Sequence, residues 1–398
     1  MLRIALSMLV GDRAKYAGLL FGITFTSFLV TFSASFLSAF LTRGFALISE
    51  NHGADVWVMD PTVQSVELTT NLPTSALDRV RSVDGVQSAV PLALGRAEVR
   101  FANGAFQSFQ VIGVDGATLS GVPPIVGGMT TAALRAPDAV VVDAGGTQGK
   151  LDTPRSAVDR WPHGEPHLDV PTRLLAAGDE LLVNDHRVQV WGRTEGLPRF
   201  PPRPLMYTTY SNADRILLPE RRRLTFVLAT AAPGVTPREL AARIEAQTGL
   251  RARSTEDFKA DTVRWYLVNS EDVNDVAGML GLATVIGLGV TGVMLYMFTT
   301  ENLWQYAVLS AMGATPRMLL TLIFAQAGAC ALLGAGLGLG LCAVVGQIAV
   351  ALVGYPFRMM WFTPLLGVAA VVVVSILAGA LSARPLLKLQ PVIVFAGR

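Results

Sequence analysis

One short segment carries residues whose types and spacing could bind a phosphate. Residues 144–151 read Ala-Gly-Gly-Thr-Gln-Gly-Lys-Leu and are similar to a phosphate-binding loop at first sight. That motif needs glycine where Ala144 stands, and serine or threonine where Leu151 stands, because a hydroxyl at the last position binds magnesium. The segment therefore does not predict a nucleotide site.

Two histidines have a spacing that could bind a metal ion on a helix. His163 and His167 are four residues apart, but Pro162 and Pro166 prevent the helix that would bring the imidazoles together. The sequence also contains no Gly-x-Ser-x-Gly, no His-Glu-x-x-His and no paired-cysteine motif. We therefore predict a non-catalytic chain with no catalytic, cofactor-binding or metal-binding residues.

Four long uncharged segments dominate the chain. Charged residues make up only 16%, against about a quarter in ordinary soluble domains, and the mean hydropathy is +0.46. A helix needs about 20 apolar residues to cross a bilayer. Transmembrane helices are therefore predicted at 16–41, 276–299, 318–353 and 359–383. The third leaves two alternatives open, one long helix or two short ones broken in its glycine-rich run.

Positive charges lie beside the ends of these segments. Basic residues in short flanking loops stay on the cytoplasmic side of the membrane. They precede the first segment, follow the second and follow the fourth: Arg3, Arg13, Lys15, Arg317, Arg384 and Lys388. The pattern predicts that residues 1–15, the loop 300–317 and the tail 384–398 are cytoplasmic. Residues 42–275 then lie on the other side.

The polar stretch 42–275 is long enough to form a domain of its own. Strand and helix patterns at both of its ends predict two β-α-β units, with a hairpin turned by Asn103 and Gly104. We expect an α/β domain with a porter-like lobe, 44–120 plus 221–270, and an inserted second lobe, 121–220. A helix at 258–269 is expected to lead directly into the second transmembrane helix as a lever.

Glycines are frequent in the second transmembrane segment. Small residues on one face let helices approach closely. Two interpretations stay open, a dimer seam and packing inside one chain. The residues predicted for such a helix-packing face or seam are Gly278, Gly281, Gly289 and Gly292.

The loop 300–317 is too apolar for an ordinary linker. Its pattern predicts a helix lying along the membrane and ended by Gly313 and Pro316. One interpretation is an interfacial helix anchored by Trp304 and Tyr306. The other is a helix that docks on a partner.

The run 305–314, Gln-Tyr-Ala-Val-Leu-Ser-Ala-Met-Gly-Ala, resembles the signature of FtsX-like permeases, which belong to the MacB-like ABC transporter superfamily. The tail, with Arg384-Pro385 and Pro391-Val392, and the layout of one helix, a large domain and three helices are similar as well. Residues 5–15 and 54–59 look closest to the DevC branch, which exports glycolipids. Gln305 and Ser310 depart from the signature, which has an acid and a basic residue at these positions.

The resemblance implies a multi-pass permease of the bacterial inner membrane with a periplasmic domain. It implies a separate ABC ATPase dimer that binds ATP and magnesium, a second permease copy or a related chain, a periplasmic adaptor protein and membrane lipid, but no nucleic acid. The loop would act as a coupling helix, docking mainly by apolar burial. The coupling residues implied are Glu301, Leu303, Gln305, Tyr306, Leu309, Met312, Gly313 and Ala314.

Three functions are compatible with this resemblance. The first is ATP-driven export of a lipid, a peptide or a drug-like substrate by mechanical transmission to the periplasm. The second is a regulator that transports nothing and activates a periplasmic cell-wall hydrolase. The third is lipoprotein release. The large outer domain favours export, because the cell-division members carry a smaller one.

Overall fold

The computed structural model describes residues 13–127, 129–155, 169–218 and 224–387. The chain divides into two compact units, which are described separately. One comprises Met1–Phe40 with Glu271–Arg398, and the other comprises Leu41–Ser270. Residues 163 and 167, the two histidines considered for a metal, lie outside the described residues.

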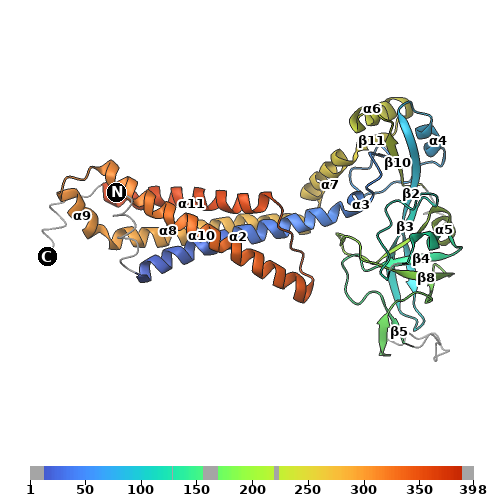
Figure 1. Cartoon of the computed structure of the whole chain (residues 1–398), viewed down its shortest axis with the longest axis horizontal. Coiled ribbons are helices and arrows are strands. Elements are labelled where there is room, and N and C mark those ends of the chain that lie inside the picture. Colours follow the sequence, from blue (N-terminus) through green and yellow to red (C-terminus); the bar gives the residue numbers. More distant parts are fainter. Residues whose placement is uncertain (1–12, 128, 156–168, 219–223, 388–398) are drawn as a thin grey trace. The chain divides into compact units, whose positions relative to one another are not determined.

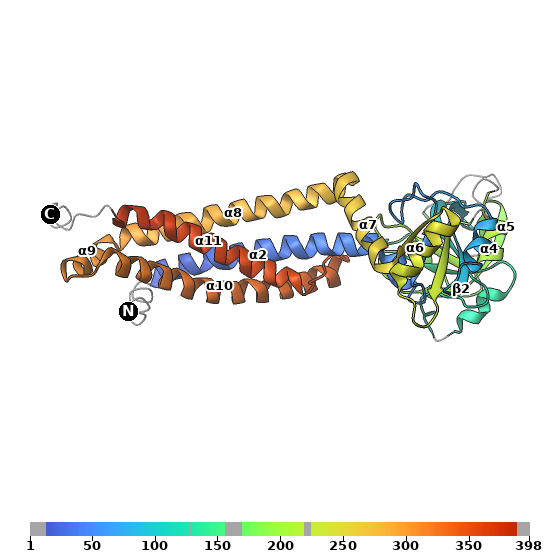
Figure 2. The same cartoon turned by 90° about the horizontal axis from the view of Figure 1, so that it is seen from above.

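Within the described residues, four helices are long and apolar enough to cross a membrane, which confirms the predicted layout (Figures 1 and 2). They are α2 (Arg13–Gly44), α8 (Glu271–Glu301), α10 (Pro316–Val353) and α11 (Phe362–Leu387). Helix α10 runs for 38 residues without a break. The glycine-rich run therefore does not divide the third span, because each of its glycines keeps helical backbone geometry.

Small residues set how closely α2 packs on its neighbours. Thr26 Oγ1 lies 3.0 Å from the carbonyl oxygen of Gly287 and 2.9 Å from Thr291 Oγ1, both on α8. Gly338 of α10 lies equally close to α2, since an added Cβ would stand 2.5 Å from Ser27 Cβ. Without side chains at these glycines, the helix backbones come near enough for polar contacts inside the membrane unit.

The other unit is built on one mixed sheet of nine strands, as the prediction of an α/β domain requires. The strand order is β11-β1-β10-β2-β3-β9-β4-β8-β7, and β2 also pairs with β7. The strands are β1 (Val56–Met59), β2 (Val86–Arg100), β3 (Phe106–Val114), β4 (Ala139–Asp143), β7 (Glu180–Val183), β8 (His186–Thr194), β9 (Leu205–Thr209), β10 (Phe226–Ala231) and β11 (Arg251–Ser254).

The first lobe is an open antiparallel part of this sheet, made of β11, β1, β10 and the first half of β2. Helices α4 (Ser75–Arg81) and α6 (Pro237–Thr248) bury their apolar faces against one side of it. On the other side, Trp57 and Phe226 pack on Phe258 of α7 (Thr255–Asn269). The fifteen-residue β2 then carries the sheet into the second lobe.

The second lobe closes into a ring of six strands, because β7 pairs with β8 on one side and with β2 on the other. Two of the pairings, β3 with β9 and β4 with β8, are parallel, and the others are antiparallel. A separate apolar core fills this lobe. Short elements complete the unit: α3 (Ala46–Glu50), η1 (Thr131–Arg135), β5 (Asp152–Pro154), β6 (Thr172–Leu174) and α5 (Tyr210–Ile216).

Two expectations differ from the structure. The lobe boundary falls inside β2, not at residue 120, because the second half of β2 and all of β3 pair with strands of the second lobe. The lever helix is not continuous with the second span. Helix α7 ends at Asn269, Ser270 has extended backbone angles (φ −99°, ψ 115°), and α8 begins at Glu271.

Candidate functional site

The loop between the second and third spans contains one short helix, α9 (Leu303–Ala311). It begins after Asn302, whose side-chain nitrogen donates a hydrogen bond to the Phe298 carbonyl over 2.8 Å. It ends where Gly313 takes a left-handed conformation (φ 97°), the geometry that glycine adopts without strain. Thr315 then caps α10 by accepting from the backbone N–H of Met318. Helix α9 is thus shorter than the stretch from Glu301 to Ala314 that contains the implied coupling residues, since Glu301 is the last residue of α8.

The buried side of α9 fastens the helix to α10. Tyr306 is fully buried and donates its hydroxyl hydrogen to Gln326 Oε1 over 2.8 Å. It packs against Leu319 and Ile323. The partly buried residues around this cluster are Leu303, Leu309, Ala314 and Leu320. Tyr306, predicted to dock on a partner, is therefore part of the internal packing of the loop.

The exposed side of α9 consists of other residues. Met312, directly after the helix, is 72% exposed and Trp304 is 45% exposed. Gln305 and Ala311 are exposed as well. At 100° per residue these positions share one face. We call Trp304, Gln305, Ala311 and Met312 the α9 outer face. Of the predicted coupling residues with large side chains, Gln305 and Met312 lie on it.

The predicted glycines of α8 divide cleanly from those that pack inside the chain. A Cβ added at Gly278, Gly281, Gly289 or Gly292 would meet no atom within 4 Å. At Gly287, by contrast, it would stand 2.5 Å from Thr26 Cγ2. Among the residues that the structure describes, these four positions therefore do not serve helix packing, and they leave a face of α8 open.

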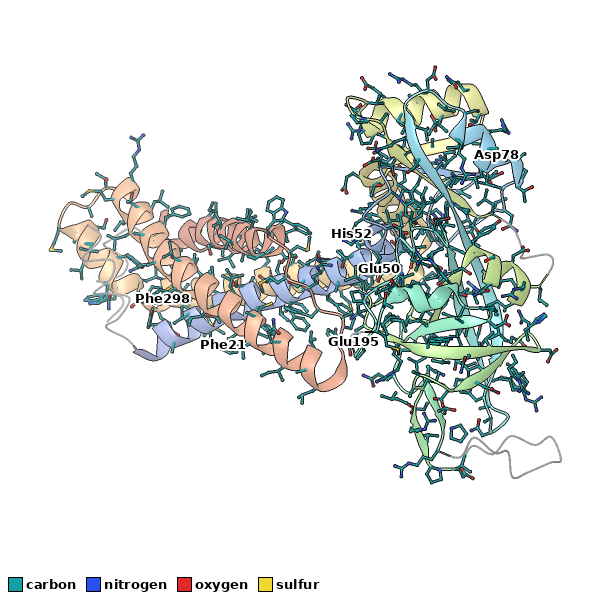
Figure 3. The ribbon with its side chains drawn as sticks, turned by 45° about the vertical axis from the view of Figure 1, so that its right-hand side comes forward. Phe21, Glu50, His52, Asp78, Glu195 and Phe298 are labelled. Carbon is teal, nitrogen blue, oxygen red and sulfur yellow. The ribbon has the colours of Figure 1, made fainter. Side chains whose placement is uncertain are left out.

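A buried charge cluster in the Leu41–Ser270 unit escaped the sequence analysis. Glu50, the last residue of α3, forms an ion pair with Arg199, and the two side chains are only 8% and 7% exposed. Tyr207 of β9 donates to Glu50 Oε2 over 3.0 Å and accepts from Arg199 Nη2 over 3.0 Å. The backbone N–H of Leu197 donates to Glu50 Oε1 over 2.7 Å. The labelled Glu50 can be followed in Figure 3.

Burial controls the protonation of this cluster. Desolvation raises the pKa of the Glu50 carboxyl, although the Arg199 charge and the hydrogen bonds from Leu197 and Tyr207 oppose that shift. Burial likewise raises the pKa of the Tyr207 phenol, so that Tyr207 remains a neutral donor. No sequence pattern could reveal the pair, because 149 positions separate Glu50 from Arg199 along the chain.

The loop that resembles a phosphate-binding segment is held by a carboxylate. Asp143 accepts from the backbone N–H of Gly145 over 2.7 Å, from Gly196 N over 2.6 Å and from Thr194 Oγ1 over 2.8 Å. The backbone N–H at the start of the loop is thus already bonded to a negative group, which disfavours an anion there. Within the described residues, no group of three or more histidine, cysteine, aspartate or glutamate side chains is placed to hold a metal.

Comparison with known proteins agrees with this arrangement. The model of the MacB-like periplasmic core domain matches residues 16–247, and the model of the FtsX-like permease C-terminal domain matches residues 277–391. No curated protein matches the sequence.

Solved structures similar to the chain include three bacterial domains. One is the periplasmic region of MacB from Actinobacillus actinomycetemcomitans, with 13% identity and a TM-score of 0.35, covering 56% of this chain and 98% of that one. Another is the extracellular domain of the ABC-type transporter YknZ from Gram-positive bacteria, with 13% identity and a TM-score of 0.31, covering 50% and 99%. A domain of a permease protein from Porphyromonas gingivalis has 15% identity and a TM-score of 0.31, covering 50% and 89%.

Proposed function

Because the chain belongs to the FtsX-like permeases with a MacB-like periplasmic core domain, we propose that it is the permease subunit of an ABC exporter that works by mechanical transmission. The observation that supports the proposal is that one side of α9 is exposed and the other side packs on α10. This helix presents an exposed face on one side and is fixed to α10 on the other through Tyr306, Gln326, Leu319 and Ile323. Force applied to the α9 outer face would reach α10 without loss in a flexible linker.

In this proposal the ATPase is a separate dimer that binds ATP and magnesium, and this chain contributes no catalytic group. The α9 outer face docks on the ATPase mainly by burying Trp304 and Met312. Well-buried apolar side chains contribute about 1.5 to 3 kcal/mol each. The lack of a basic residue at Ser310 and of an acid at Gln305 supports docking by apolar burial over docking by ion pairs.

We extend the proposal to the remaining parts of the transporter, with the family membership as support. The chain lies in the inner membrane with both ends in the cytoplasm, works with a second copy and passes movement to a periplasmic adaptor protein. The open glycine positions of α8 supply the face for the second copy. The substrate is a lipid, a peptide or a drug-like molecule, and the DevC-like segments 5–15 and 54–59 favour a glycolipid.

The decisive experiment is co-purification of the ATPase with variants of the α9 outer face. Met312→Glu places a charge on a side chain that is exposed in the free chain, so folding is preserved while apolar docking is lost. Trp304→Ala removes the largest apolar surface. The matched control is Met279→Ala at the far end of α8, where the side chain is 55% exposed.

We expect Met312→Glu to abolish recovery of the ATPase and Trp304→Ala to reduce it about ten-fold, whereas Met279→Ala binds normally. Normal binding by the two loop variants would overturn the docking role. The proteins that co-purify with the unaltered chain distinguish the three candidate functions. An ATPase with a periplasmic adaptor supports export, an ATPase with a cell-wall hydrolase supports the regulator, and bound lipoproteins support lipoprotein release.

A further inference from the structure

The end of α2 is tied into the Leu41–Ser270 unit by a loop of the second lobe. The backbone N–H of Phe200, which lies between β8 and β9, donates to the Arg43 carbonyl over 3.2 Å. Tyr266 of α7 donates its hydroxyl hydrogen to the Phe200 carbonyl over 2.9 Å, and the two rings lie 5.6 Å apart. Tyr266 also covers Gly44, because a Cβ added there would stand 2.5 Å from Tyr266 Cε2. We call Arg43, Gly44, Phe200 and Tyr266 the clasp.

The clasp is buried, and the ion pair next to it strengthens the connection. Phe200 and Tyr266 are 8% and 3% exposed. Arg199, which precedes Phe200, is paired with Glu50 at the end of α3, and α3 follows α2 after a single residue. Segments with many buried contacts resist local opening. The end of α2 is therefore built into the domain.

The connection by which the chain leaves the domain is different. After Tyr266 the last turn of α7 is exposed, with Leu267 at 42% and Val268 at 71%. Ser270 then has extended backbone angles, so the helical hydrogen bonds of α7 do not continue into α8. Segments with few buried contacts are those that move most easily, and large backbone changes are absorbed at the ends of elements. The chain therefore bends more easily at Ser270 than at the clasp.

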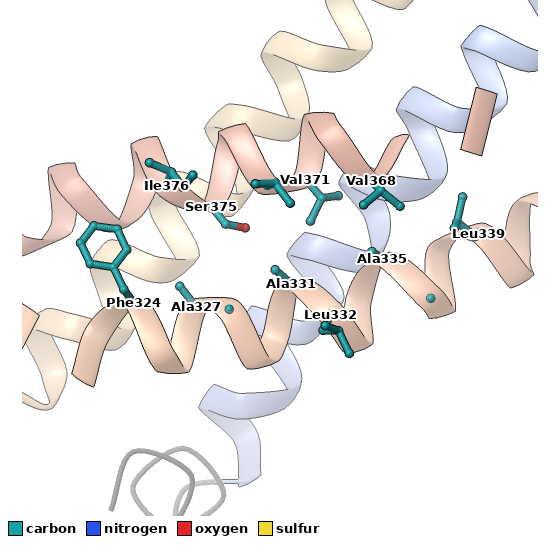
Figure 4. Close-up of a pocket in the computed structure, with 13 residues that line it drawn as sticks. Phe324, Ala327, Ala331, Leu332, Ala335, Leu339, Val368, Val371, Ser375 and Ile376 are labelled. Atoms are coloured by element: carbon teal, nitrogen blue, oxygen red, sulfur yellow. The ribbon is translucent and has the colours of Figure 1, made fainter. Parts of the chain in front are cut away.

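Inside the membrane unit, α10 is in close contact with α2. Ser27 of α2 donates to the Ala335 carbonyl of α10 over 3.1 Å, and a Cβ added at Gly338 would stand 2.5 Å from Ser27 Cβ. Between α10 and α11, by contrast, lies an apolar groove of about 400 Å³ (Figure 4). A Cβ added at Gly328 or Gly336, which line this groove, would meet no atom within 4 Å. Beside the groove, α10 thus packs more tightly on α2 than on α11.

We propose that α2 is the helix that carries movement into the periplasmic domain, and that Ser270 is a joint at which α8 is uncoupled from this domain. The inference rests on the proposed permease function and adds the route of transmission. Movement of α9 passes through Tyr306 to α10, from α10 to α2, and through the clasp to the second lobe. The lever is therefore the first span, and not the second span as the sequence predicted.

The test measures movement of the domain in the complex of the full chain with its ATPase in nanodiscs. Spin labels are attached at Asp78→Cys in the domain and at Leu365→Cys in α11, where the side chains are 83% and 59% exposed. Cys330 and Cys342 are replaced by alanine. The labelled chain is diluted with unlabelled chain, so that the distance within one chain is measured. It is recorded without nucleotide and after trapping with ATP and vanadate.

Two insertions form a matched pair. Two glycines after Phe40 interrupt α2 before the clasp, and two glycines after Ser270 lengthen the joint. We expect the nucleotide-dependent change in distance to fall at least about five-fold in the first variant and to keep its full size in the second. The reverse result would show that α8 carries the movement. Equal results in the two variants would show that neither connection dominates, and either outcome would overturn the inference.

A second arm acts on the clasp without changing the length of the chain. Gly44→Val pushes the Tyr266 ring away, whereas Gly340→Val is the control, because a Cβ added at Gly340 would meet no atom within 4 Å. We expect the change in distance to be at least about two-fold smaller in Gly44→Val and normal in Gly340→Val. A change of full size in Gly44→Val would overturn the role of the clasp.

Recovery of the ATPase separates failure of the inference from failure of the proposed function. All variants should recover the ATPase as well as the unaltered chain does, because none alters the α9 outer face. An unaltered chain that binds the ATPase but shows no change in distance would overturn the inference and leave the docking role standing. An unaltered chain that recovers no ATPase would overturn the proposed function, and the inference with it.

Discussion

Tyr207 and Arg199 both contact the same carboxylate oxygen of Glu50, so a strand of the closed ring and the segment after β8 are tied to α3. Helix α3 follows α2 after a single residue, Phe45, and α2 is the first membrane-spanning helix. The cluster therefore fixes the second lobe to α3 within the Leu41–Ser270 unit. The proposed mechanical transmission requires this part of the domain to stay rigid.

Removing the charge of Glu50 should be strongly destabilising. Glu50→Gln leaves the Arg199 guanidinium buried without its counter-ion, and breaking a buried pair in this way costs about 3 to 5 kcal/mol. Thermal unfolding of the full chain in detergent, followed by tryptophan fluorescence, measures the loss. Glu50→Gln combined with Arg199→Met should recover much of it, since no buried charge remains. The control is Glu256→Gln, which breaks an exposed pair with Lys259 worth at most about 1 kcal/mol.

The carboxylate of Asp257 should make stability depend on pH. Hydrogen bonds from Arg238 and then from Ser254 lower the pKa of Asp257 below its ordinary 3.8. A carboxyl whose pKa is lower in the folded than in the unfolded state stabilises the fold at every pH above its unfolded-state pKa. This contribution is lost as the pH falls through the folded-state pKa. Asp257→Asn should therefore lower the melting temperature at pH 7.

The difference in melting temperature between the unaltered chain and Asp257→Asn should become smaller when the pH falls below about 4. Melting curves between pH 3 and pH 7 provide the check. Asp78→Asn alters a carboxylate that is 83% exposed and serves as control. A difference between Asp257→Asn and the unaltered chain that stays constant over this range would contradict the assigned ion pair.

Two glycines on α8 should respond in opposite ways to the same substitution. Gly287→Val places side-chain atoms against Thr26, where an added Cβ already stands 2.5 Å from Cγ2, so α2 and α8 must separate. Gly289→Val meets open space and should leave the fold intact. Protease resistance in detergent reports folding, and chemical cross-linking reports self-association.

If α8 is the face for a second copy, Gly289→Val should weaken cross-linking between copies while resistance to protease stays normal. Unchanged cross-linking would remove these open glycines from the dimer seam. Gly287→Val that keeps full protease resistance would show that the close approach to Thr26 is dispensable.

The hydrogen bond between α9 and α10 should contribute to stability. Tyr306→Phe removes the bond to Gln326 Oε1 in a buried setting, a loss of about 1 to 2 kcal/mol. The melting temperature should fall, whereas the matched variant Tyr296→Phe, on an α8 side chain that is 50% exposed, should not change it. Equal melting temperatures for the two variants would mean that α9 is held by apolar packing alone.

The membrane helices were predictable because their signal is local. The segment 359–383 has no charged residue, and the hydropathy of each residue can be read without knowing its neighbours in space. The β2–β3 hairpin was predictable in the same way, although of its two predicted turn residues only Gly104 is left-handed (φ 79°), and Asn103 Oδ1 accepts from the backbone N–H of Ala105. The continuity of α10 was not predictable, because helical glycines are tolerated or not according to what packs beside them.

The α9 helix shows what a sequence pattern can and cannot predict. The sequence predicted that the loop 300–317 contains an apolar helix ended by Gly313, and the structure has this helix at Leu303–Ala311. The three-dimensional structure was needed to show which side of α9 is exposed, because the burial of Tyr306 depends on Gln326, Leu319 and Ile323 of the next helix. The turn between α9 and α10 brings those residues together, and the periodicity of α9 does not predict these contacts.

Four membrane helices, a large α/β domain and membership of a permease family were predictable from the amino-acid sequence, because hydropathy and short motifs are properties of neighbouring residues. The three-dimensional structure was needed to show that β2 belongs to both lobes and that Glu50 meets Arg199. Each of these depends on contacts between residues far apart in the chain. Such contacts arise from the packing of whole elements, which no local pattern encodes.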